Sequence, residues 1–183
     1  MIIYLEGPDG SGKSTLSDAI TRELIEKDKA VYQVKDGNCA INTRPKSSER
    51  NTLNELVLAI TSMAYDDTNI YVLDRGPISD VIYREFDDYL PVINKAPLVS
   101  LLDSMIQNNK LLMIFCLTDV AEQKMLERGD DNPIAIKKHK QITKRYKEWD
   151  NLYDYAIFDY TDSEINEFIE NVVTPWIEEE ANE

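Results

Sequence analysis

The 183-residue chain is poor in the residues that build covalent or metal frameworks. It has two cysteines, Cys39 and Cys116, and a single histidine, His139. Two thiols this far apart do not indicate a disulfide framework or a metal cluster, and Cys116 lies in an apolar run where a thiol usually serves packing. The histidine has no partner visible in the sequence, so we expect it on the solvated face of a helix. The fold should therefore depend on an ordinary hydrophobic core.

Positive charge and long hydrophobic runs are also scarce. Twenty Lys and Arg residues stand against 34 Asp and Glu, which gives a net charge of −14. A field of this sign opposes broad contact with nucleic acid and gives no attraction to an anionic membrane. No apolar run approaches the roughly 18 residues that span a bilayer, and no signal-peptide pattern opens the chain. We expect a cytoplasmic protein without a membrane partner, which captures anionic ligands through a local group of cations.

Short apolar runs alternate with helical patterns along the whole chain. The runs predict strands at residues 2–5, 30–34, 70–73, 111–117 and 155–158. Apolar residues at helical spacing predict helices at about 16–27, 53–65, 78–89, 97–108, 120–127, 134–149 and 163–177. This alternation predicts an α/β fold in one domain, residues 1–183, with a five-stranded parallel sheet and helices on both faces. Ligands of such sheets bind at the carboxyl ends of the strands.

A complete phosphate-binding loop follows the first predicted strand. Gly7, Gly12, Lys13 and Ser14 match the pattern Gly-x4-Gly-Lys-Ser. Glycines allow a tight turn in which backbone N–H groups point at phosphate oxygens, and the next helix adds the positive end of its dipole. We expect Lys13 to reach the β and γ phosphates of ATP and Ser14 to ligate Mg²⁺. The residues expected to bind ATP are Gly7, Asp9, Gly10, Ser11, Gly12, Lys13, Ser14 and Thr15.

The third predicted strand ends at Asp74 and Arg75, on the same edge of the sheet as the loop. A carboxylate there can hold Mg²⁺ together with Ser14, and an arginine can hold the acceptor or the transferring phosphoryl group. The alternative is a surface turn with an adjacent pair of charges.

A polar break at residues 128–133 separates two predicted helices. It suits a small lid, at about 128–140, that closes over the phosphates and excludes water. Arg128 is the candidate to contact phosphate, with Lys137 or Lys138 behind it. The alternative for the lysines is the solvated face of a helix.

These residues resemble the thymidylate kinase and deoxynucleoside kinase branch of P-loop kinases over nearly the whole chain. The segment at 5–15 is similar to the thymidylate kinase form of the loop, and Asp74-Arg75 is similar to the pair that ends the third strand in that family. The resemblance implies a P-loop kinase fold and a phosphotransferase that uses ATP and Mg²⁺. It also implies an acidic residue after the second strand, which contacts the acceptor in thymidylate kinases and is the general base in deoxynucleoside kinases. Asp36 falls there, with an ordinary turn residue as the alternative.

Two features leave the acceptor open. The helix at 53–65 lacks the arginine that helps thymidylate kinases bind the acceptor, and Met63 stands near its place. The Ser-Asp pair at 79–80 is similar to a segment of deoxynucleoside kinases. The resemblance thus implies transfer of the ATP γ-phosphoryl group to a deoxynucleoside monophosphate, pyrimidine favoured, or alternatively to the 5′-hydroxyl of a deoxynucleoside. With the residues argued above, we expect the catalytic residues to be Lys13, Asp36, Asp74, Arg75 and Arg128, and the metal ligands to be Ser14 and Asp74.

Further interpretations remain. Relatives of this branch in some viruses with modified DNA act on a hydroxymethylated base within DNA, but the net charge disfavours a DNA strand as partner. A nucleotide-dependent switch would use the same loop, yet the string at 94–97 lacks the aspartate of the base-reading Asn-Lys-x-Asp sequence. The helices at 53–65 and 97–108 suit a homodimer, as in similar kinases, or ordinary core. The short chain, rich in Asn, Asp and Tyr, would suit a viral protein acting in the host cytoplasm.

Overall fold

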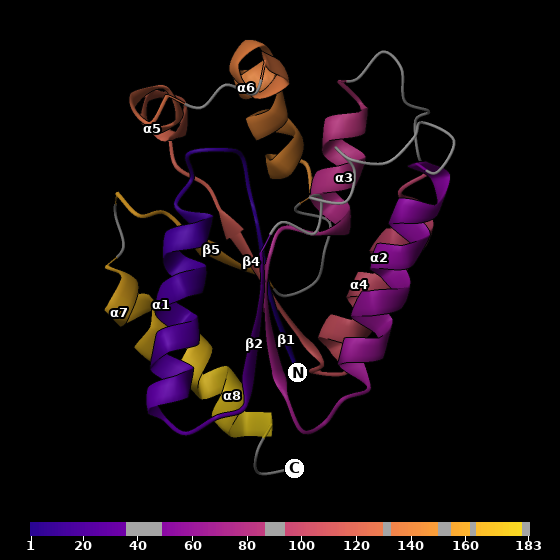
Figure 1. Cartoon of the computed structure of the whole chain (residues 1–183), viewed down its shortest axis with the longest axis vertical. Coiled ribbons are helices and arrows are strands. Elements are labelled where there is room, and N and C mark those ends of the chain that lie inside the picture. The colour runs from indigo at the N-terminus through magenta and orange to yellow at the C-terminus, as the bar shows by residue number, and fades with distance from the viewer. Residues whose placement is uncertain (36–48, 87–93, 130–132, 150–154, 162–163, 181–183) are drawn as a thin grey trace.

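The computed structural model describes residues 1–35, 49–86, 94–129, 133–149, 155–161 and 164–180 (Figure 1). Within them, five strands form one sheet in which every pair is parallel. Their order across the sheet is β2-β3-β1-β4-β5. The strands are β1 (Ile2–Glu6), β2 (Val31–Lys35), β3 (Ile70–Asp74), β4 (Leu111–Cys116) and β5 (Tyr155–Phe158). The predicted five-stranded parallel sheet is therefore confirmed.

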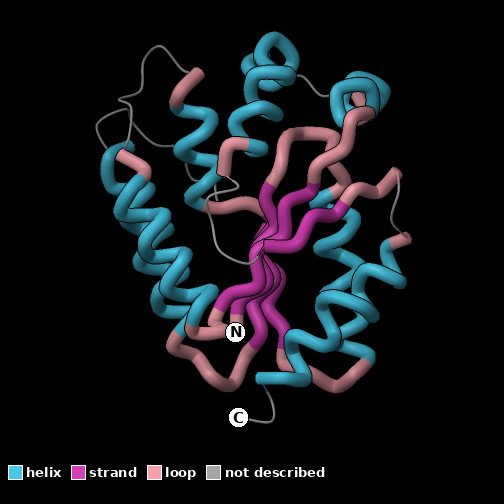
Figure 2. Tube along the Cα trace, turned by 180° about the vertical axis from the view of Figure 1, so that it is seen from behind, coloured by secondary structure: helices cyan, strands magenta, loops and turns pink. Residues whose placement is uncertain are grey.

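Helices cover both faces of the sheet, as Figures 1 and 2 show. One face carries α1 (Lys13–Glu26), α7 (Ile165–Phe168), the π-helical turn η2 (Ile169–Val173) and α8 (Thr174–Glu180). The other carries α2 (Glu49–Ala64), α3 (Pro77–Arg84) and α4 (Ala96–Gln107). Two further helices, α5 (Ala121–Glu127) and α6 (Pro133–Lys147), lie over the edge where the strands end. In the described part of the chain, no helix has both the length and the apolar character needed to cross a bilayer.

The sheet has a hydrophobic core on each face, and the central strand β1 contributes side chains to both. Its side chains alternate between the faces, so that Ile2 and Tyr4 join the core under α2, α3 and α4, whereas Ile3 and Leu5 join the core under α1 and α8. All of β1 is buried, which explains its continuous apolar run. The last residue of β1, Glu6, is buried like the others but carries a charged side chain.

The core under α4 gives a first prediction. Leu102 in α4 is fully buried, and Leu102→Ala removes packed methyl groups and leaves a cavity. We expect the free energy of unfolding to fall by about 2–5 kcal/mol in urea denaturation. The control Leu58→Ala in α2, where the side chain is 66% exposed, should change it by less than about 0.5 kcal/mol. Equal losses in the two variants would contradict the packing described.

Candidate active site

The phosphate-binding loop joins β1 to α1 at the carboxyl edge of the sheet (Figure 1). Gly10 and Gly12 have φ angles of 81° and 85°, in the left-handed region that favours glycine. A Cβ on Gly10 would also collide with the carbonyl oxygen of Ala121, so the close approach of the loop to α5 requires glycine. Because Gly12 directly precedes α1, the loop meets the positive end of that helix. The backbone thus has the shape that a phosphate cradle requires.

The ammonium group of Lys13 lies inside this loop. Its Nζ donates hydrogen bonds to the carbonyl oxygen of Pro8 at 2.6 Å and to Ser11 Oγ at 3.2 Å. Burial, and next the positive charge of Arg75, lowers the pKa of Lys13 to about 8. Lys13 is therefore close to its protonation midpoint at mildly alkaline pH, and an added negative charge would favour its charged form.

Ser14 and Asp74 bring two oxygens together at the start of α1. Ser14 Oγ donates a hydrogen bond to Asp74 Oδ2 at 2.5 Å, and Asp74 is buried at the end of β3. No group of three or more His, Cys, Asp or Glu in the described residues could hold a metal by itself. Mg²⁺ keeps several waters and takes other ligands from one or two carboxylates and from substrate phosphates. The pair therefore fits a Mg²⁺ that is bound together with a nucleotide.

Arg75 follows Asp74 and has a φ of 77°, uncommon for a residue other than glycine. Its Nη2 pairs with the carboxylate of Asp9 in the phosphate loop. Its Nη1 donates hydrogen bonds to the carbonyl oxygen of Gly7 at 3.2 Å, to Ser79 Oγ at 3.2 Å and to the Tyr146 hydroxyl at 3.3 Å. The guanidinium is thus fixed between the phosphate loop and helices α3 and α6.

Asp9, predicted to bind ATP, has its side chain among protein groups. Besides Arg75, its carboxylate accepts a hydrogen bond from the Tyr83 hydroxyl at 2.8 Å. Burial alone would raise the pKa of Asp9, but the charges of Arg75 and Lys13 outweigh it and hold the pKa below its usual value. Asp9 is therefore a charged anchor of the loop, and its contact with nucleotide stays a prediction.

Glu6 is a buried residue of the site that the sequence analysis missed. Its Oε1 accepts hydrogen bonds from the N–H groups of Gly76 at 3.0 Å and Ser79 at 3.1 Å, and from the Tyr4 hydroxyl. Its Oε2 accepts one from Ser79 Oγ at 2.5 Å. Burial raises its pKa. This carboxylate caps α3, and the only signal in the sequence was an acidic residue at the end of an apolar strand.

The prediction for His139 was wrong. The side chain is 5% exposed, and its Nε2 lies 3.0 Å from the carbonyl oxygen of Asp9. The lysines around it are exposed, as expected: Lys137, Lys138, Lys140, Lys144 and Lys147. His139 belongs instead to the buried stripe His139, Ile142, Tyr146 and Trp149. Its helical spacing is the signal that could have identified the inner face of α6.

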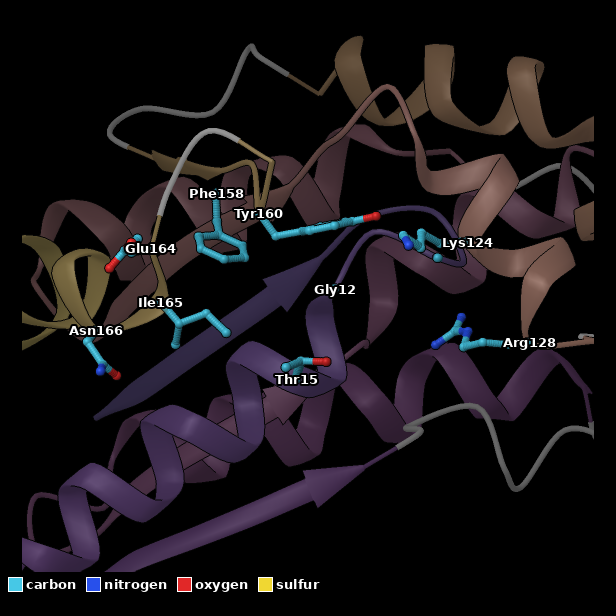
Figure 3. Close-up of a pocket in the computed structure, with 10 residues that line it drawn as sticks. Gly12, Thr15, Lys124, Arg128, Phe158, Tyr160, Glu164, Ile165 and Asn166 are labelled. Atoms are coloured by element: carbon cyan, nitrogen blue, oxygen red, sulfur yellow. The ribbon is translucent and has the colours of Figure 1, made fainter.

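A cavity of about 560 Å³ opens beside the phosphate loop (Figure 3). Gly10, Gly12 and Thr15 line one side, and the segment after β5 lines another. The ring of Tyr160 lies against the loop, since a Cβ on Gly12 would be 3.1 Å from its Cδ1. Arg128 also lines the cavity, with Lys124 of α5. The structure therefore brings Arg128 to the phosphate loop.

Some of the other predicted site residues lie together in the structure, and some fall outside the described residues. Lys13, Ser14, Asp74 and Arg75 lie together at one edge of the sheet. Asp36 and residues 130–132 of the predicted lid are outside the described residues. Of the rest of that region, Arg128 and Gly129 follow the end of α5, and residues 133–140 belong to α6, which is docked on the body of the protein through its buried stripe.

Comparison with known sequences identifies distant relatives. No protein-family model matches the chain. A thymidylate kinase of Chlamydia caviae is 27% identical over 163 residues, which cover 74% of this chain and 77% of that protein. A thymidylate kinase of Chlamydia abortus is 26% identical over 147 residues, covering 70% and 68%.

Solved structures share the fold. The YorR protein of Bacillus subtilis, in complex with phosphorylated GDP, has a TM-score of 0.70 and 20% identity, covering 100% of this chain and 99% of that one. Deoxyadenosine kinase from M. mycoides with bound dATP has a TM-score of 0.56 and 16% identity, covering 96% and 98%. The structural likeness shows the fold, and the sequence relatives are kinases. The chain is a P-loop phosphotransferase, a nucleotide or nucleoside kinase that resembles the thymidylate kinase and deoxynucleoside kinase branch.

The lowered pKa of Lys13 gives a second prediction. At pH 9, above a pKa of about 8, Lys13 is mainly neutral in the free protein. Nucleotide phosphates stabilise the ammonium, so binding of ADP at pH 9 should take up protons, and fewer as the pH falls toward 7. Calorimetry in buffers of different ionisation enthalpy measures this uptake. Residual binding by Lys13→Met should take up none, and an unchanged uptake in that variant would assign the proton elsewhere.

Proposed function

We propose that the chain transfers the γ-phosphoryl group of Mg·ATP to a deoxynucleoside monophosphate, with a pyrimidine base favoured. The observation that carries the proposal is the convergence of the phosphate loop, the Ser14–Asp74 oxygen pair and the Arg75 guanidinium at one sheet edge. Phosphoryl transfer depends on positioning and charge stabilisation more than on covalent chemistry. The thymidylate kinase relatives support a monophosphate as the acceptor.

The proposed roles follow from the contacts. Lys13 and the loop N–H groups hold the β and γ phosphates, and the nucleoside of ATP occupies the cavity of about 560 Å³, a volume typical of ligand pockets. Ser14 and Asp74 would hold Mg²⁺, whose charge neutralises phosphate oxygens. Arg75 and Arg128 stabilise negative charge in the transition state. In the described residues, Nη1 of Arg75 donates hydrogen bonds only to neutral oxygens. A charged phosphate oxygen forms a stronger hydrogen bond with a guanidinium, so it can take the place of these acceptors.

A deoxynucleoside is the second candidate acceptor. The structural likeness to deoxyadenosine kinase favours it. Without an acceptor phosphate, the 5′-hydroxyl needs a general base, and Asp36 is the candidate from the sequence. In both cases the donor half of the site is the same.

An acceptor panel tests the proposal directly. We expect ADP release from ATP and Mg²⁺ to be fastest with a pyrimidine deoxynucleoside monophosphate and to be unaffected by short DNA strands. Release stimulated only by deoxynucleosides would support the second candidate. Release stimulated by DNA containing hydroxymethylated bases would overturn both. Slow hydrolysis that no acceptor stimulates would favour a nucleotide switch.

Replacement of Lys13 tests the donor site. Lys13→Ala should abolish acceptor-dependent ADP release, because it removes the cation expected at the β and γ phosphates. It should not lower the stability of the fold, since burial already disfavours the charged ammonium. The control Lys29→Ala alters an exposed lysine beyond α1 and should keep normal activity. Near-normal activity of a folded Lys13→Ala protein would overturn the mechanism.

Replacement of Asp36 separates the two acceptors. Asp36→Asn removes a base while keeping a similar shape. If the acceptor is a nucleoside, kcat should fall by roughly 10²–10⁴. If it is a monophosphate, we expect mainly a higher KM for the acceptor. Steady-state kinetics distinguish these results, and unchanged values of both constants would remove Asp36 from the site.

A further inference from the structure

Helix α6 touches the phosphate loop through one buried side chain. His139 Nε2 lies 3.0 Å from the carbonyl oxygen of Asp9. A carbonyl oxygen only accepts hydrogen bonds, so Nε2 must carry the proton and act as the donor. Thr143 Oγ1, one turn further along α6, lies 3.5 Å from the other ring nitrogen. The imidazole is therefore oriented with its N–H toward the loop.

The remainder of α6 is held firmly, so His139 has a fixed base. Tyr146 of α6, and Trp149 in the turn just after the helix, are buried in the same core as α3 and α4. The Tyr146 hydroxyl is 2.7 Å from Ser79 Oγ. Glu85, which follows α3, is joined to α6 by an ion pair with Arg145 at 2.7 Å. A hydrogen bond from this helix therefore acts as a rigid attachment for the loop.

The contact fixes the orientation of one peptide group. In a trans peptide the C=O and the following N–H point in opposite directions. With the Asp9 carbonyl held toward α6, the N–H of Gly10 points away from α6, and Gly10 lines the cavity beside the loop. The Asp9 side chain is anchored by Arg75 and Tyr83, but side-chain contacts do not stop rotation of the peptide group that follows. Glycine at position 10 makes such a rotation easy.

We propose that His139 is a positioning residue that holds the Asp9–Gly10 peptide with the Gly10 N–H directed at the phosphates of the nucleotide. The inference rests on the proposed use of the loop for a nucleoside triphosphate. It adds that α6, an element remote in sequence from the loop, prepares a phosphate-binding amide before the nucleotide arrives. Pre-orientation of this kind raises affinity because the peptide need not be ordered on binding.

Two variants of similar length test this role. His139→Gln keeps an N–H donor that can reach the Asp9 carbonyl, whereas His139→Met fills the same space without a donor. We expect the affinity for ADP, measured by calorimetry, to fall about tenfold in His139→Met and to stay within about threefold of the original in His139→Gln. The affinity for adenosine, measured by NMR titration, should be unchanged in both because it has no phosphate. Gln141→Ala, an exposed change on the same helix, is the control.

The outcomes are distinct. Equal ADP affinities in the Gln and Met variants, or parallel losses for ADP and adenosine, would overturn the positioning role. If thermal denaturation shows that His139→Met does not fold, His139→Asn replaces it, since its shorter amide does not reach the carbonyl. These measurements need no acceptor. A negative acceptor panel would therefore overturn the proposed function without affecting this test.

Discussion

The buried carboxylate of Glu6 is the constraint on which the geometry of the site depends. It ends the central strand β1 and directly precedes the phosphate loop. A buried carboxylate without partners costs several kcal/mol, so its oxygens must meet donors. Those donors are two N–H groups and a hydroxyl at the start of α3, at 2.5–3.1 Å, together with the Tyr4 hydroxyl. The first turn of α3 is consequently fixed relative to the strand that carries the donor loop.

The position of Arg75 depends on the attachment of α3 to Glu6. It lies between the end of β3, whose position is set by pairing with β1, and the capped start of α3. In this connection Arg75 has a φ of 77°, and its guanidinium contacts Asp9, Ser79 and Tyr146. The phosphate loop and the arginine proposed to stabilise the transition state thus share one anchor.

The sequence predicted what local patterns determine. Each strand of the sheet was an apolar run, and the loop residues and Asp74-Arg75 follow the strands that carry them to one edge. Glu6 and His139 could not be assigned in the same way, because their partners lie 70 and 130 residues away, at the N-cap of α3 and in the phosphate loop. His139 was also hidden among lysines. Packing of Ile142 and Tyr146 determines which face of α6 is buried, and this packing alone distinguishes His139 from the exposed lysines.

Asp9 explains how an acidic protein keeps two cations ready for a polyanion. Lys13 and Arg75 lie close enough for each to disfavour charge on the other, and Asp9 offsets both. It contacts Arg75 directly, so Arg75 is compensated in the free protein, whereas Lys13 keeps a pKa of only about 8. Incoming phosphates therefore act chiefly on Lys13. Interactions in this buried site are strong, while most exposed acids are screened by salt beyond about 8–10 Å, so the net charge does not prevent local anion binding.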